Sequence, residues 1–325
     1  MKETIKKYKW VFQLVVSICL AIYIYKRIDY SSFSASFKVL PWYIVVIVPI
    51  IGLLQVYITT LTQIKLFSIY TNDISKMPTF KNNFVAAFYG MAVPGLIGSD
   101  LFLVNYFGKK INSYFNALTG IFFLRVIGLI VFVTLIFISF FFLNSTTYAI
   151  ISKFDFNLKQ SVILGGLIAI SVSVVVFFIF RKFFLRYYGI LKQKLLPLID
   201  LIRLEKGKTF LILALIFVYY LVAIGGRALL AKMAGIQLSI VELSALIMIV
   251  NLLIMLPISY SGIGIREGGY ISLLVLLNID KSKAVLFSIM DFSITIFVYS
   301  VGSAIALFWL LLKRRKTIVG KSPVI

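Results

Sequence analysis

Histidine is absent from this chain, and cysteine occurs once, at Cys19. Without imidazole, His-based acid–base catalysis and the commoner zinc or haem sites are excluded, and a single thiol cannot form an internal disulfide or a thiolate cluster. Acidic residues are also scarce, with 11 Asp and Glu against 33 Lys and Arg. We therefore expect no metal site, no cofactor and no catalytic residue.

Apolar residues are what the chain has in abundance: 61% are hydrophobic, 16% aromatic and only 14% charged over 325 residues. This exceeds any soluble composition and predicts an all-α polytopic membrane protein, with residues 1–325 forming a single integral membrane domain. The net charge of +22 does not indicate nucleic-acid binding, because Lys and Arg cluster at the ends of apolar runs, as at 313–316. That pattern is typical of membrane topology and of contact with lipid headgroups.

Six apolar segments are long enough to cross a bilayer fully. They are 8–25, 39–61, 114–143, 161–180, 209–230 and 284–312. The first resembles a signal peptide because basic residues precede it, but it continues without a small-residue cleavage site. We interpret it as a retained span.

Two further apolar segments, 84–107 and 241–277, are interrupted near their centres by Pro and Gly. The first leaves arms of roughly 10–12 residues, which suit a re-entrant helical hairpin better than a span. Gly95 and Asp100 have the same spacing as Gly262 and Glu267, so the second segment repeats the pattern. The residues expected to break the helices are Pro94, Gly95, Gly98, Pro257, Gly262 and Gly264.

Loop charge predicts the orientation of these segments. The loop 181–208 carries eight basic residues and two acidic ones, which places it in the cytoplasm together with both basic termini. The two hairpins then enter from opposite faces, and halves 1–150 and 151–325 form an inverted-topology repeat with a shift of about 167 residues. The simpler alternative is that any membrane protein of eight segments can be divided into two by eye.

Charges inside the two hairpins are the candidate functional residues, because ionisable groups at membrane depth usually line a cavity. Arg266, with the amides of a half-helix N-terminus, suits a phosphate or carboxylate. Asp100 and Glu267 have two interpretations: they stabilise the first turns of short helices, or they bind a proton, a cation or an amine-bearing headgroup. Arg266 is also a possible neutralising neighbour of Glu267. Ser259 and Ser261 are expected to lie in the same cavity.

Arg125 and Asp291 lie at matching places in the two halves, 25 and 24 residues after the hairpin carboxylates. We expect both to face the cavity, paired with each other or with the hairpin charges. The alternative is that each snorkels or forms a local hydrogen bond. Arg227, near the end of its span, is expected to snorkel rather than to bind substrate.

Three stretches of sequence together resemble one family. They are Pro257 to Gly268 with its Arg-Glu-Gly triplet, Pro94 to Asp100, and Arg125 to Leu129. They are similar to the transmembrane region of the lysylphosphatidylglycerol synthase family, also called the flippase-like domain, and the resemblance covers nearly the whole chain. It implies movement of a lipid, such as an aminoacylated phospholipid, between leaflets.

The chain departs from that family's pattern at several sites. Ser99 replaces a common Gly, Leu103 lies where an Arg is frequent nearby, and Leu124 stands where an acidic residue usually precedes Arg125. These differences imply a different substrate. Asp291 stands where a basic residue is expected, which fits pairing with Arg125. The sequence after Lys321 leaves no room for an aminoacyl-transfer domain, so lysyl transfer is not expected.

We therefore expect a translocase for a lipid or lipid-linked precursor, anionic or aminoacylated, in the prokaryotic cytoplasmic (inner) membrane. Its partners would be membrane lipids, a second copy in a homodimer, or envelope-synthesis enzymes, and not nucleic acid. Two alternatives stay open: a membrane glycosyl or headgroup transferase, and a non-transporting accessory subunit of an envelope-synthesis complex. Outer loop 144–160 holds only one carboxylate, Asp155, which argues against the transferase.

Overall fold

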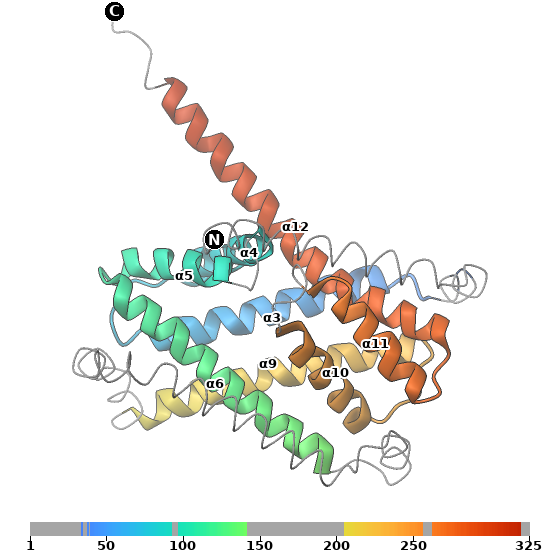
Figure 1. Cartoon of the computed structure of the whole chain (residues 1–325). Coiled ribbons are helices and arrows are strands. Elements are labelled where there is room, and N and C mark those ends of the chain that lie inside the picture. Colours follow the sequence, from blue (N-terminus) through green and yellow to red (C-terminus); the bar gives the residue numbers. More distant parts are fainter. Residues whose placement is uncertain are drawn as a thin grey trace, which may run out of the picture.

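The structure is a computed structural model that describes residues 40–92, 97–141, 205–255 and 262–319, together with residues 34 and 38. Every regular element in these ranges is a helix, which agrees with the expected all-α architecture. In chain order the helices are α3 (Ile44–Phe67), α4 (Lys76–Ala92), α5 (Ile97–Lys110), α6 (Tyr114–Phe141), α9 (Lys206–Met233), α10 (Ile240–Met255), α11 (Ile265–Leu276) and α12 (Lys281–Val319) (Figure 1).

Four of these helices, α3, α6, α9 and α12, are long and apolar enough to cross a bilayer. They coincide with four of the six expected spans, those at 39–61, 114–143, 209–230 and 284–312. The expected spans at 8–25 and 161–180 lie outside the described residues. Many large apolar side chains on the four long helices are exposed. Such surfaces are suited to contact with lipid, where only the helical backbone is self-satisfied.

The two interrupted segments each form a pair of short helices, α4 with α5 and α10 with α11 (Figure 1). The first arm is longer than expected: α4 has 17 residues and begins at Lys76 rather than near 84, because the polar turn before the apolar run is also helical. Gly98 was expected in the break but lies inside α5, where it is buried. Pro94, Gly95 and Pro257 lie outside the described residues.

Left-handed glycines lead into α11. The φ angle is 77° at Gly262 and 84° at Gly264, and residues with a Cβ atom rarely adopt such positive values. At Gly262 a Cβ atom would also lie 2.8 Å from the side chain of Ile254. Glycine is therefore required at the entry of this helix, as the sequence predicts.

The turn after each helix pair has the same geometry in both halves. Asn112 follows α5 and Asn278 follows α11, with φ angles of 54° and 58°. In each turn the next backbone N–H donates to a carbonyl oxygen five residues earlier, Gly108 in one and Leu274 in the other, at 3.0 Å. This pattern terminates helices through a left-handed residue. The two turns are separated by a shift close to the one that the sequence predicts.

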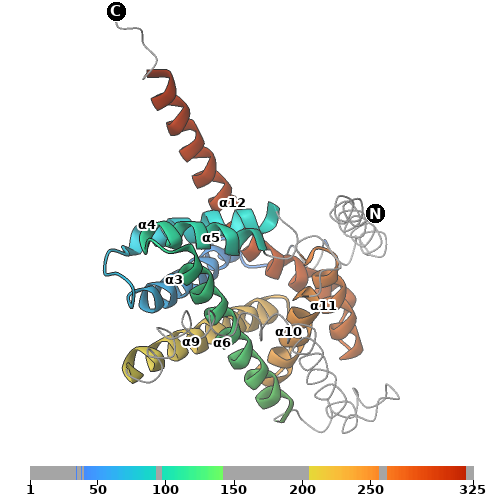
Figure 2. The ribbon, with the colours of Figure 1, turned by 60° about the vertical axis from the view of Figure 1, so that its left-hand side comes forward.

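Helix packing has the same twofold correspondence. Exchanging α3 with α9, α4 with α10, α5 with α11 and α6 with α12 converts each packed pair of described helices into another packed pair. Thus α4 lies against α12 while α10 lies against α6, and α3 packs on α9 at the centre (Figure 2). The described helices therefore form two similar four-helix sets that pack on each other.

The largest apolar core lies between α9, α10, α11 and α12, with α3 at its edge. Its centre is Tyr270, which is fully buried and packs edge-on against Phe287 with ring centroids 5.1 Å apart. A second core around Phe67 and Phe107, whose rings are stacked at 4.1 Å, joins α3 to α5 and α6.

Candidate functional site

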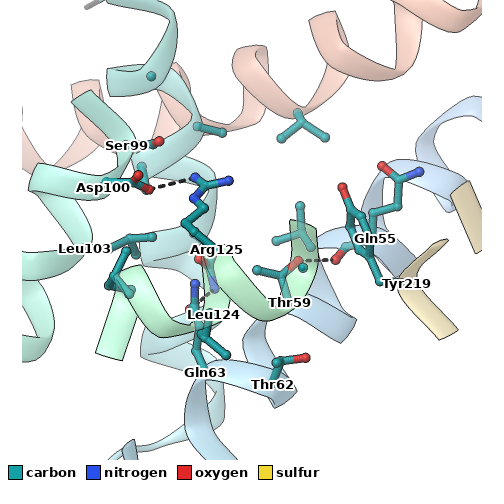
Figure 3. Close-up of a pocket in the computed structure, with 18 of the residues that line it drawn as sticks. Gln55, Thr59, Thr62, Gln63, Ser99, Asp100, Leu103, Leu124, Arg125 and Tyr219 are labelled. Carbon is teal, nitrogen blue, oxygen red and sulfur yellow. Dashed lines mark hydrogen bonds and ion pairs between the residues drawn. The ribbon is translucent and has the colours of Figure 1, made fainter. Parts of the chain in front are cut away.

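A cavity of about 440 Å³ lies between α3, α4, α5, α6, α9 and α12. Its volume falls in the range of roughly 300–1,000 Å³ that is typical of small-molecule sites. Figure 3 shows the lining, in which amide and hydroxyl side chains of α3 face the charges of α5 and α6. Three charged residues line it: Asp100, Arg125 and Arg227. A cavity that combines these charges with amide and hydroxyl groups is the strongest candidate site in the described part of the chain.

Arg125 and Asp100 form an ion pair across the cavity wall. The Arg125 Nη2 atom donates to Asp100 Oδ1 at 2.7 Å (Figure 3), and the two side chains are 56% and 32% exposed. At a rise of 1.5 Å per residue, Arg125 lies about 16 Å from the start of α6, close to the middle of the helix. Asp100 lies in the first turn of α5, where a carboxylate also stabilises the helix N-terminus. The structure thus joins the charge on the short helix α5 to the charge on the long helix α6, one of the two pairings expected.

Asp291 does not pair with Arg125, which excludes the other expected pairing. Its Oδ1 atom lies 2.6 Å from the Nε atom of Arg227, and the two side chains are 1% and 14% exposed. The prediction that Arg227 snorkels is therefore wrong. A carboxylate buried on α12 needs a nearby cation, and α9 supplies it because its C-terminal half packs beside α12. Sequence spacing cannot reveal a partner on a different helix.

A group of neutral polar residues on α3 and α4 was not predicted from the sequence as part of the site. The Asn83 side-chain amide donates to Thr60 Oγ1 and to Gln63 Oε1, both at 2.9 Å. Gln55 also lines the cavity, and its Nε2 atom is buried without a hydrogen-bond partner among the described residues. The available signal was the row of Gln and Thr residues between 55 and 63, which is unusual in an apolar span.

Arg266 lies behind the cavity wall rather than in it. Its side chain is buried, its Nη1 atom donates to Thr295 Oγ1 at 2.9 Å, and its guanidinium lies 5.3 Å from the ring centre of Phe292. Thr295 does line the cavity. The α10–α11 pair therefore reaches the candidate site through one hydroxyl group on α12.

Comparison with known families agrees with these observations. The family model described as the lysylphosphatidylglycerol synthase TM region matches residues 10–303. The chain belongs to this family. No curated protein and no solved structure matches the chain. Membership in the lysylphosphatidylglycerol synthase TM family, together with the four long apolar helices, makes this a multi-pass membrane protein related to lipid modification or flipping.

Within the Arg-Glu-Gly triplet that first suggested this family, Glu267 has a local role. Its carboxylate accepts a hydrogen bond from the backbone N–H of Gly264 at the start of α11. A Glu at this position satisfies a backbone donor that the helix leaves unpaired. Its other oxygen is buried without a described partner, and Glu267 does not line the described cavity. The helix-stabilising interpretation therefore has a direct structural basis.

This assignment predicts different outcomes for two substitutions of Glu267. Glu267→Ala is expected to lower stability by about 0.5–2 kcal/mol, the usual cost of losing a helix cap, whereas Glu267→Gln keeps an acceptor oxygen and is expected to stay near wild type. Thermal unfolding of purified protein in detergent measures both. Glu242→Ala is the matched control, because Glu242 accepts from the Ser239 N–H at the start of α10. A Gln variant as unstable as the Ala variant would contradict the capping role.

The remaining predicted site residues, Ser259 and Ser261, lie outside the described residues. The described residues contain no group of three or more His, Cys, Asp or Glu side chains able to hold a metal ion. The site therefore consists of the Arg125–Asp100 pair, Arg227 with its buried partner, and the amides and hydroxyls of α3, α4, α9 and α12.

Proposed function

We propose that this protein is a lipid translocase of the prokaryotic inner membrane, which moves an anionic phospholipid or lipid-linked precursor between leaflets. The observation that carries the proposal is the Arg125–Asp100 pair in a polar cavity of about 440 Å³ bounded by apolar helices. Charges at membrane depth are costly and are retained where they serve a substrate path. Family membership supports a lipid as the substrate.

The proposed architecture has six spans, two opposed re-entrant hairpins and inverted halves 1–150 and 151–325, with both termini in the cytoplasm. The corresponding helix packing of the two sets and their matching Asn turns support it. In inverted-repeat transporters the substrate site lies near the midplane at the interface of the repeats. The lining of the cavity supports such a place for it, since residues of α3 to α6 contribute together with residues of α9 and α12. Alternating access would expose it to each leaflet in turn.

A proteoliposome assay with a fluorescent anionic phospholipid tests this proposal directly. Wild-type protein is expected to move the lipid faster than empty vesicles do. Arg125→Gln is expected to slow movement about 10- to 100-fold, because hydrogen bonds to charged groups contribute about 1.5–3 kcal/mol. No movement of any anionic lipid above empty vesicles would contradict the translocase.

The charge-swapped double variant Asp100→Arg with Arg125→Asp separates pairing from sequence position. It keeps an ion pair between α5 and α6 while moving the cation from one helix to the other. We expect it to fold better than either single variant, as judged by monodisperse elution in detergent. Equal folding of the double and single variants would contradict a structural contribution of the pair.

A further inference from the structure

We propose that the cavity selects a hydroxyl-bearing anionic headgroup, such as a phosphodiester with a polyol, and rejects an aminoacylated cationic one. This inference rests on the proposed translocase function and names its substrate class. It arises from the balance of charges and neutral donors in the cavity lining.

The charged groups of the lining favour an anion. Arg125 and Arg227 are the two guanidinium groups among the described lining residues, but Arg227 is already paired with the buried Asp291, 2.6 Å away. The cation that remains for a ligand is Arg125, and the described lining has one carboxylate, Asp100. That carboxylate is already 2.7 Å from the Arg125 guanidinium. An ammonium group approaching Asp100 would therefore meet a like charge beside it.

Arg125 retains capacity for a ligand. A guanidinium has five N–H donors in a planar fork, and the hydrogen bond to Asp100 uses only one of them. The side chain is 56% exposed and lines the cavity. A phosphodiester oxygen is the kind of acceptor that such a group binds with charge-assisted hydrogen bonds.

Neutral hydrogen-bonding groups cover the wall opposite the ion pair. Gln55, Thr59 and Gln63 of α3 line the cavity (Figure 3). The Thr59 hydroxyl donates to the backbone carbonyl of Gln55, and Gln63 Oε1 accepts from Asn83, both at 2.9 Å. The Gln55 Nε2 donor has no described partner and is buried. Amide and hydroxyl groups suit the hydroxyls of a polyol, which both donate and accept. None of them adds a carboxylate with which a cationic headgroup could pair.

Two apolar residues beside the ion pair occupy positions where a charged side chain would have changed the charge of the cavity lining. Leu124, next to Arg125, and Leu103, one turn after Asp100, both line the cavity. Neither contributes a charge, so Asp100, which is paired with Arg125, stays the one carboxylate among the described lining residues. The headgroup preference therefore follows from this chain's own residues.

The test combines binding and transport of two lipids that differ only in the headgroup. Purified protein is titrated in detergent with phosphatidylglycerol and with lysylphosphatidylglycerol, and both lipids, labelled on an acyl chain, are followed in proteoliposomes of phosphatidylcholine. We expect phosphatidylglycerol to bind and move at least about 10-fold better, which corresponds to about 1.4 kcal/mol. Glycerol 3-phosphate is the soluble arm, and it is expected to compete only weakly.

An isosteric charge substitution tests whether the cavity causes the selectivity. Gln63→Glu adds one carboxylate to the lining without changing side-chain shape, and it is expected to reduce the preference for phosphatidylglycerol several-fold. Asn116→Asp adds the same charge at the start of α6, away from the cavity lining, and is expected to leave the preference unchanged. Both variants must first elute as wild type does in detergent.

The outcomes separate the inference from the function on which it rests. Equal or better binding of lysylphosphatidylglycerol or phosphatidylcholine would overturn the headgroup selection and leave a translocase. Selective binding without movement would overturn the translocase and uphold the headgroup selection. Strong competition by glycerol 3-phosphate would reassign the site to a soluble anion. Loss of selectivity in Asn116→Asp would overturn the placement in the cavity, and absence of both binding and movement would overturn both proposals.

Discussion

Asp291→Ala is expected to lower the free energy of unfolding by about 3–5 kcal/mol, the usual cost of breaking a buried ion pair by removing one partner. The substitution leaves Arg227, whose side chain is only 14% exposed, without its counter-charge between α9 and α12. Arg227→Ala is expected to cost a similar amount, because it leaves the buried carboxylate unpaired. Thermal unfolding in detergent and the yield of monodisperse protein measure both.

Two controls test whether the loss of stability comes from breaking the buried ion pair. Replacing both partners, with Arg227→Met and Asp291→Leu, is expected to restore much of the stability, since an apolar pair of similar volume often substitutes for a buried ion pair. The exposed pair Glu205–Lys208 at the start of α9 is the matched surface control. Glu205→Gln is expected to change stability by only about 0–1 kcal/mol. A single Asp291 variant as stable as Glu205→Gln would contradict the structural importance of the buried pair.

Gly302→Leu is expected to prevent the close packing of α4 against α12 and to give little or no folded protein. A Cβ atom at Gly302 would lie 2.0 Å from the carbonyl oxygen of Phe84 and 3.2 Å from the Cβ of Phe88. The nearest obstacle is backbone, so no side-chain rotation relieves it. Even Gly302→Ala is expected to cost about 1–3 kcal/mol, the usual penalty for overpacking. Size-exclusion elution and thermal unfolding in detergent measure the effect.

Gly225 provides the matched control for this substitution. It lies on α9, another long apolar helix, but a Cβ atom there would have no neighbouring atom within 4 Å. Gly225→Ala is expected to be neutral or slightly stabilising, because alanine has the higher helix propensity. If Gly302→Ala and Gly225→Ala behave alike, α4 and α12 are further apart than the structure places them.

Much of the fold follows from the sequence because apolar length and helix breakers act locally. Four long helices and the two interrupted segments lie where hydropathy, Pro and Gly predict them. The boundary of α4 was misplaced because the polar residues from Lys76 extend a helix that hydropathy alone begins later. Gly98 was expected to interrupt the helix, but it lies in the first turn of α5, where a glycine does not end the helix.

The candidate site was only partly predictable. The Asp100 and Arg125 charges were recognisable because each interrupts an apolar segment, and the structure pairs them. The partner of Asp291 was not recognisable, because it depends on how α9 packs against α12. Arg266 was expected in the cavity, yet its long side chain turns to Thr295 and Phe292 instead. Which way a charged side chain turns is a property of the tertiary packing.

The attachments of α12 restrict how the cavity can change shape. At Gly302 the helix touches the backbone of α4, at Asp291 it is held to α9 by the ion pair, and at Thr295 it receives the hydrogen bond from α11. The contact with α4 is close packing of one backbone against another, whereas the other two contacts are each made by a pair of polar side chains. Motion that widens the cavity should therefore carry α4 and α12 together as one rigid body that moves relative to α9. An inserted crosslink between α4 and α12 should leave transport intact, while one between α9 and α12 should arrest it.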